Sequence, residues 1–360
     1  MSLSANASSP IPASSAPLLQ AEGVTVRFDA CERPFDVVRD VSFTLHPGRT
    51  LCLVGESGCG KSMTALSLLR LIPEPGRLAA GRILFEGRDL AELSESAMER
   101  VRGRDIGMIF QEPMTSLNPV IRVGEQVAEP LMRHLRLSKK AALAEAVELF
   151  RLVGIPAPDM RVRDYPHQLS GGMRQRVMIA MALACSPRLI IADEPTTALD
   201  VTIQAQILDL LRNLKDKINS SIMFITHDLG VIAEMADYVV VMYAGRIVEQ
   251  GTAEEIFAHP AHPYTIGLMA SKPVVGRQVE KLYSIPGKVP NPINMPDYCY
   301  FKDRCEMCVA QCSGEYPCEV SISPTHKVSC YRYYDGKRPD LEEQVEKEMP
   351  GSADNGKEGE

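Results

Sequence analysis

A glycine-rich segment at residues 55–62 has the residue types and the spacing of a phosphate-binding loop. Glycines let backbone N–H groups curl around a phosphate, and a helix that starts at the loop adds a favourable dipole. Lys61 is predicted to reach the β- and γ-phosphates of a nucleotide, and Ser62 to coordinate Mg²⁺. The residues, which match the pattern GxxxxGK[ST], are Gly55, Glu56, Ser57, Gly58, Cys59, Gly60, Lys61 and Ser62.

Two acidic residues directly follow a short apolar run at Leu189–Ala192. The run is predicted to be a buried strand, and an acid at the edge of a parallel sheet lies beside the bound phosphates. Asp193 is therefore expected to hold Mg²⁺, directly or through water. Glu194 is expected to orient or deprotonate the water that attacks the γ-phosphate.

A third segment, Leu169–Arg176, has the composition of a helix start. Ser170 is a good N-cap residue, and Gly171 and Gly172 expose backbone N–H groups in the first turn. Taken alone, this segment fits an ordinary capped helix as well as it fits a functional one.

The elements that must position these residues are predicted as one α/β domain over residues 20–255. Several nearly continuous apolar runs are typical of parallel strands buried on both faces. The stretch from about 120 to 164 is rich in Ala, Leu and Glu with helical periodicity, and Ser62–Leu71 follows the loop as a helix. The predicted strands are Val24–Phe28, Val41–Leu45, Thr50–Val54, Ile106–Phe110, Leu189–Ala192, Ile222–Thr226, Tyr238–Tyr243 and Ile247–Gly251.

The remaining residues divide into three segments. Residues 1–19 are rich in Ser, Ala and Pro and lack the pattern of a signal peptide, so they are expected to be a disordered lead-in to a cytoplasmic protein. Residues 256–338 are rich in Pro and Tyr and contain a cysteine window. Residues 339–360 are acidic and polar, which predicts a disordered tail.

Taken together and in this order, the motifs resemble those of the ABC ATPases. Leu169–Arg176 resembles the family's signature sequence, Gln111 its Q-loop, Asp200 its D-loop and His227 its switch histidine. The resemblance implies a P-loop NTPase (RecA-like) core with an antiparallel β subdomain and a helical signature subdomain. A small Cys-rich C-terminal extension would follow.

The resemblance also implies roles for these residues. Two nucleotide domains would pair head to tail, so that Ser170, Gly171 and Gly172 serve the partner's ATP. Gln111 would sense the γ-phosphate and contribute to the Mg²⁺ site, while His227 would support hydrolysis beside Glu194. Met173 departs from the Gln usual in the family and leaves the Ser and Gly contacts intact. The aromatic that stacks on adenine is either Phe28 or Phe35.

Three features resemble the oligopeptide/dipeptide importers, and in particular their D-type ATPase subunit. They are Glu112–Pro119 after Gln111, the sequence His262-Pro263-Tyr264-Thr265, and the cysteine window. This implies uptake of di- or oligopeptides, with nickel, glutathione or an oligosaccharide as alternative cargo. The implied partners are two transmembrane permeases, a second and heterologous ATPase, and an extracytoplasmic solute-binding protein. The implied location is peripheral, at the cytoplasmic face of a bacterial plasma membrane.

Six of the ten cysteines crowd into residues 299–330. Four thiolates suit Zn²⁺ or an iron–sulfur cluster equally well, and the spacing matches no common pattern for either. The subfamily resemblance implies a [4Fe-4S] cluster and leaves Cys308 and Cys318 outside the set. Unligated thiols are the third possibility. The implied ligands are Cys299, Cys305, Cys312 and Cys330.

Composition argues against other classes. The net charge of −7 disfavours nucleic-acid binding through a broad basic face. A soluble ABC ATPase acting on DNA would carry a long coiled-coil insertion, but about 107 residues without sustained heptads separate Lys61 from Leu169. Translation members of the family carry two cassettes, whereas this chain has one. No apolar run approaches the roughly 18 residues of a membrane-spanning helix.

Overall fold

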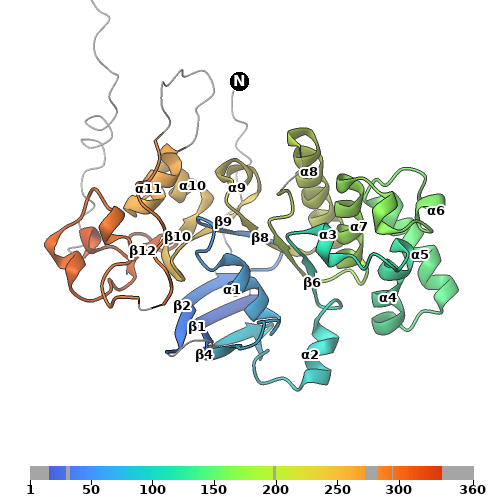
Figure 1. The fold of residues 1–360 in the computed structure, drawn as a ribbon, viewed down its shortest axis with the longest axis horizontal. Coiled ribbons are helices and arrows are strands. Elements are labelled where there is room, and N and C mark those ends of the chain that lie inside the picture. Colours follow the sequence, from blue (N-terminus) through green and yellow to red (C-terminus); the bar gives the residue numbers. More distant parts are fainter. Residues whose placement is uncertain (1–15, 30–32, 198–199, 272–282, 294, 335–360) are drawn as a thin grey trace, which may run out of the picture.

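The computed structural model describes residues 16–29, 33–197, 200–271, 283–293 and 295–334. Two sheets organise this part of the chain: a four-stranded sheet in the order β2-β1-β4-β5, and an eight-stranded sheet in the order β11-β12-β10-β9-β3-β8-β7-β6. Figure 1 shows the small sheet in blue below the large one, the green helices on one side and the orange-red C-terminal part on the other.

The centre of the large sheet is parallel, as the apolar runs predict. β6, β7, β8, β3 and β9 pair in parallel, and β10 turns back antiparallel to β9. Nearly every residue of these strands is buried, because both faces of the sheet are covered. The bounds are β3 (Thr50–Val54), β6 (Ile106–Ile109), β7 (Leu189–Asp193), β8 (Ser221–Thr226), β9 (Tyr238–Tyr243) and β10 (Arg246–Thr252).

The small sheet is antiparallel and was only half visible in the sequence. The strands predicted at Val24–Phe28 and Val41–Leu45 are the ends of β1 (Leu19–Phe28) and β2 (Phe35–Leu45). β4 (Gly76–Phe85) was missed because only its last residues, Ile83 and Phe85, are buried; the short β5 is Arg88–Asp89. Leu19 is fully buried, so the described strand begins one residue before the predicted domain start at 20.

Helices flank both sheets and form a region of their own beyond β6. The predicted helical stretch at 120–164 contains α4, α5 and α6, and α4 packs on α5 and on α7 (Figure 1). Ser94, Ser138 and Ser170 cap the N-termini of α2, α5 and α7 with their hydroxyls. The bounds are α1 (Lys61–Leu68), α2 (Glu95–Val101), α3 (Pro113–Ser116), α4 (Val123–Leu135), α5 (Lys139–Leu152), α6 (Pro158–Arg161), α7 (Gly171–Leu183), α8 (Val201–Ile218) and α9 (Leu229–Met235).

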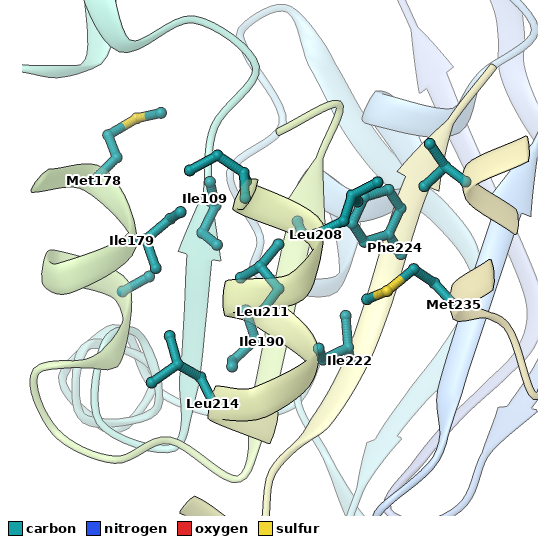
Figure 2. Close-up of a cluster of buried hydrophobic side chains, with 14 of the residues drawn as sticks. Ile109, Met178, Ile179, Ile190, Leu208, Leu211, Leu214, Ile222, Phe224 and Met235 are labelled. Atoms are coloured by element: carbon teal, nitrogen blue, oxygen red, sulfur yellow. The ribbon is translucent and has the colours of Figure 1, made fainter. Parts of the chain in front are cut away.

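The main core lies between the large sheet and the helices α7, α8 and α9. Figure 2 shows strand residues of β6, β7 and β8 facing α8 and α7, with Met235 of α9 closing the side. Burial of each such side chain stabilises the fold by about 1.5–3 kcal/mol. The labelled members, all buried, are Ile109, Met178, Ile179, Ile190, Leu208, Leu211, Leu214, Ile222, Phe224 and Met235.

The C-terminal part continues the large sheet. After β10 the chain forms α10 (Ala253–Ala258) and α11 (Pro263–Ala270), and later returns as β11 (Val320–Ser321) and β12 (Lys327–Val328). β12 pairs antiparallel with β10 through Glu249 and Val328. The Glu249 carboxylate, fully buried, accepts the N–H groups of Ala261 and His262 at 2.7 and 2.8 Å.

His326 adds a further contact to the buried Glu249 carboxylate. Its ring Nε2 lies 2.7 Å from Glu249 Oε1, and neither side chain is exposed to solvent.

In the described part of the chain, no helix is both long and apolar enough to cross a membrane. The lead-in at 1–15 and the tail at 339–360 lie outside the described residues.

Candidate nucleotide site

The phosphate-binding loop joins β3 to α1, as the motif requires. Gly55 has φ +157, and a Cβ there would lie 2.2 Å from the Met242 carbonyl oxygen of β9, so only glycine fits. Gly60 has φ +102 at the N-cap of α1. Lys61 is buried, and its ammonium group donates to the Gly55 and Glu56 carbonyls at 2.8 and 3.1 Å. The loop is thereby closed around its own lysine.

Ser62, in the first turn of α1, and Asp193, at the end of β7, are in contact. The Ser62 hydroxyl donates to Asp193 Oδ1 at 3.0 Å. Burial raises the pKa of Asp193, and the hydrogen bond from Ser62 partly offsets this. A hydroxyl and a carboxylate are the oxygen donors that Mg²⁺ prefers, so this pair suits the cation that accompanies a nucleotide triphosphate.

Glu194 lies at the end of β7 and is held by three side chains. Its backbone has φ +44, an unusual value for a residue with a side chain. Gln111 Nε2 and the Thr197 hydroxyl donate to Glu194 Oε2 at 3.2 and 2.9 Å. His227 Nδ1 lies 3.4 Å from the other oxygen, Oε1. Such an arrangement fixes the carboxylate at one place, as a general base requires.

A cavity of about 370 Å³ brings together six of the predicted site residues. It places the loop beside Gln111, Glu194 and His227, which come from three different connections at the same end of the parallel strands. Two lining residues, Val54 of β3 and Leu268 of α11, were not predicted as site residues. The described residues that line it are Val54, Gly55, Glu56, Ser57, Gln111, Glu194, His227 and Leu268.

The signature and D-loop residues lie elsewhere in this chain. Among the described residues that line the cavity, none comes from Ser170–Gly172 or is Asp200. The Ser170 hydroxyl caps α7 by accepting the Met173 N–H at 3.3 Å, and Asp200 caps α8 by accepting the Ile203 N–H at 2.9 Å. The structure therefore gives both residues local roles in a single chain. Residues 198 and 199 of the predicted D-loop lie outside the described residues.

The two aromatic candidates for adenine stacking lie together. Phe28 and Phe35 face each other at the ends of β1 and β2, with ring centroids 5.9 Å apart and planes 18° apart. The choice between them stays a prediction, because the two rings form one stacked pair.

The four cysteines of the predicted cluster lie close together in the C-terminal part. Burial, together with the neighbouring thiols of Cys312 and Cys330, raises the pKa of Cys299 to about 11 and that of Cys305 to about 12. Within the described ranges, no three or more His, Cys, Asp or Glu side chains are arranged to hold one metal ion. The iron–sulfur prediction therefore stays a prediction.

Two residues at the loop were missed by sequence reasoning. The phenol oxygen of Tyr264, in α11, accepts the Glu56 N–H at 2.8 Å. Arg304 donates two hydrogen bonds to the Glu56 carboxylate, at 2.7 and 3.0 Å. Tyr264 was noted only as part of a subfamily motif, and no local pattern marks Arg304.

The parallel sheet, the phosphate-binding loop and the acids at the strand ends define an ATPase of the ATP-binding-cassette type. The family model described as ABC transporter matches residues 38–197. A second family model, described as the C-terminal region of oligopeptide/dipeptide transporters, matches residues 248–312.

Curated relatives match over most of the chain. A putative peptide import ATP-binding protein of Brucella abortus (strain 2308) is 51% identical over 329 residues, which cover 88% of this chain and 97% of that protein. The oligopeptide transport ATP-binding protein OppD of Bacillus subtilis (strain 168) is 52% identical over 316 residues, 87% of this chain and 88% of that protein. The chain belongs to the ATP-binding subunits of the oligopeptide/dipeptide ABC transporter family, and it is an ABC-type ATPase.

Solved structures agree on the fold. The dimeric ATP-binding cassette MJ0796, in a post-hydrolysis state bound to ADP and Pi, matches with a TM-score of 0.58 at 26% identity, over 65% of this chain and 98% of that one. The cbiO1 structure from Clostridium perfringens matches with a TM-score of 0.58 at 25% identity, over 68% of this chain and 91% of that one.

Proposed function

We propose that this chain powers the uptake of di- and oligopeptides from the cytoplasmic face of a bacterial plasma membrane. The observation that carries the proposal is the presence of this candidate nucleotide site in a chain about 50% identical to peptide-import subunits along nearly its whole length. We assign residues 20–255 to the ATPase and 256–338 to the family-specific extension.

The geometry supports the following division of labour. The loop amides and Lys61 hold the phosphates of ATP. Ser62 and Asp193, whose side-chain oxygens are 3.0 Å apart, would hold the Mg²⁺ that neutralises charge on the phosphates, and Gln111, which lines the cavity, would contribute to the same site. Glu194 accepts the proton of the attacking water, because Gln111, Thr197 and His227 fix its carboxylate beside the cavity. In the full motif, the loop backbone includes Gly55, Glu56, Ser57, Gly58, Cys59 and Gly60.

A second ATPase copy or homologue would complete the site. Ser170, Gly171 and Gly172 do not line the cavity of their own chain, yet Ser170 starts a helix whose first amides suit a phosphate. In a head-to-tail pair they would reach the partner's ATP, with Asp200 at the same interface. The MJ0796 cassette of the same fold is dimeric. The D-type resemblance favours a heterologous partner over a second copy.

The permeases would dock on the helical region. A groove of about 270 Å³ lies along α4 and α5 and is lined by Ile121, Glu125, Ala128, Glu129, Met132, Lys139 and Leu143. Two strongly exposed apolar side chains precede this region in the chain, Met114 at 68% and Val120 at 78% exposed. A short amphipathic helix from one of the two permease subunits would occupy this groove. An extracytoplasmic binding protein would deliver the cargo to the permeases.

A [4Fe-4S] cluster on Cys299, Cys305, Cys312 and Cys330 remains part of the proposal, with Zn²⁺ as the alternative. The four thiols lie near enough to one another that their charges raise the pKa values of Cys299, Cys305 and Cys330, and four thiolates suit either group. Bound there, the cluster would link the segments that carry the four cysteines. Anaerobic purification should give iron and acid-labile sulfide, which a C305S variant should lose and a C318S variant should keep. Zinc, or neither element, would refute the cluster.

Uptake of labelled peptides tests the function. Cells carrying the wild-type protein should accumulate labelled di- and oligopeptides in an energy-dependent way, and cells carrying E194Q should not. Equal peptide uptake in both would refute the peptide cargo. The same assay with nickel, glutathione or an oligosaccharide would then identify the solute.

A further inference from the structure

We propose that Arg304 and Tyr264 of the extension are positioning residues for the phosphate-binding loop, and that they act on ATP affinity through Glu56. The inference rests on the proposed role of the loop in nucleotide binding. It gives a part in ATP affinity to two residues that lie outside residues 20–255, the segment assigned to the ATPase.

The first contact is a bidentate ion pair between Arg304 and Glu56 of the loop. Arg304 Nη1 and Nη2 lie 2.7 and 3.0 Å from the two oxygens of the Glu56 carboxylate, a geometry in which a guanidinium recognises both oxygens at once. The Arg304 side chain is 6% exposed, whereas that of Glu56 is 30% exposed and lines the cavity. The hydrogen bonds to Glu56 raise the pKa of Arg304.

The guanidinium is itself held from behind. Its Nε donates to the Pro286 carbonyl at 2.7 Å, and its Nη1 also donates to the Tyr243 hydroxyl at 3.3 Å. Its carbon lies 5.7 Å from the ring centre of Tyr243 and 5.9 Å from that of Phe301. Arg304 therefore cannot swing toward the cavity without breaking contacts on both sides.

The second contact fixes the loop backbone. The Tyr264 hydroxyl, at the start of α11, accepts the Glu56 N–H at 2.8 Å, while Lys61 holds the Glu56 carbonyl at 3.1 Å. The Tyr264 ring packs on Tyr243 and Phe301, with centroids 4.8 and 5.4 Å away. The backbone of Glu56 is thus held at its N–H by the extension and at its carbonyl by Lys61 of the cassette.

The consequence is electrostatic as well as geometric. A carboxylate that lines a phosphate-binding cavity repels the incoming polyphosphate, and low local dielectric strengthens that repulsion. Arg304 neutralises the Glu56 carboxylate and holds it in a fixed ion pair. Loss of Arg304 would free a negative charge at the cavity and loosen the loop.

The experiment measures Mg-ATP hydrolysis and ATP binding with the full chain in its assembled complex. R304Q should raise KM and Kd for ATP about tenfold, equivalent to about 1.4 kcal/mol, with kcat within twofold of wild type. R304K, which keeps the charge and loses the fork, should fall between the two. Y264F should raise KM about threefold.

The double variant E56Q/R304Q separates an electrostatic role from a structural one. Removal of the carboxylate charge should restore most of the ATP affinity lost in R304Q, although the ion pair is still absent. Y238F is the matched control, because its hydroxyl donates to the Thr325 carbonyl of the extension at 3.0 Å and does not line the cavity. It should keep the wild-type KM.

The outcomes are distinguishable. An unchanged KM in R304Q, or a KM that rises equally in Y238F, would overturn the inference and leave the ATPase intact. Failure of the double variant to recover affinity would overturn the electrostatic role. Failure of the wild-type protein itself to bind ATP would overturn the proposed function instead.

Discussion

Two buried acids show how differently the cassette and the extension use charge. Asp193, at the end of β7, accepts a hydrogen bond from Ser62, and burial raises its pKa. Glu249, in β10, accepts two backbone N–H groups and bonds His326, with both side chains fully buried. The first acid keeps a raised pKa beside the phosphate-binding loop, and its pairing with a hydroxyl suits a cation. The second is satisfied by the chain itself and holds the extension to the sheet.

The largest expected effect is on the satisfied acid. E249A should lower the free energy of unfolding by about 3 kcal/mol or more, because it leaves His326 and two buried N–H groups without their acceptor. Urea unfolding monitored by circular dichroism measures it. E254A, an exposed acid in the next helix, is the control and should cost well under about 1 kcal/mol. Equal, small losses would contradict the anchoring role.

The next effect is on nucleotide binding. K61A should weaken ATP binding about 100-fold, which corresponds to about 2.7 kcal/mol, because it removes a charge-assisted contact to the phosphates. Equilibrium titration with ATP measures the Kd. K217A, an exposed lysine near the end of α8, should leave the Kd unchanged. An unaffected Kd in K61A would break the assignment of residues 55–62.

A change of opposite sign is expected at Asp193, whose charged form is disfavoured by burial. D193N should stabilise the nucleotide-free protein by on the order of 1 kcal/mol while abolishing Mg-dependent ATP hydrolysis. Because the folded pKa of Asp193 is raised, the wild type should lose stability as the pH rises from the ordinary value of 3.8 through the raised value. The advantage of D193N should grow over the same range. Destabilisation by D193N at pH 7 would contradict the contrast between Asp193 and Glu249.

The smallest effect in a single chain is at the signature serine. S170A removes a helix cap and should cost about 1 kcal/mol of stability or less, whereas S170G should cost a few tenths. In the assembled ATPase pair, both should reduce turnover far more than this loss of stability explains, because the residue would serve the partner's ATP. Comparison of thermal unfolding of the isolated chain with turnover of the complex measures the difference. Matched small losses in both assays would contradict a role across the interface.

Sequence reasoning reached the nucleotide site because local pattern and function coincide there. The strands before Gly55 and Asp193 are continuous apolar runs, and the polar residues follow each run at the edge where parallel strands end. β4 was not predicted because Gly76, Gly81 and several exposed positions interrupt the alternation of buried and exposed side chains along the strand. Gln111 and His227 were predicted only from the family resemblance, because no local sequence pattern marks them as site residues.

The contacts of the extension could not be predicted in the same way. Arg304 lies 248 residues from Glu56 and Tyr264 lies 208 residues from it. Only the return of the chain along β10, through α11 and into β12 brings them to the loop (Figure 1). The pairing depends on tertiary packing, which no spacing in the sequence encodes.

The most direct test of the account is the hydrolysis and binding of ATP by the E194Q variant in the assembled complex. Removal of the carboxylate that Gln111, Thr197 and His227 hold should lower kcat about 10³-fold, within the range for loss of a general base, while the Kd for ATP stays within about threefold of wild type. E148Q, on the exposed face of α5, should behave as wild type. Near-normal turnover in E194Q would contradict the hydrolytic site described above.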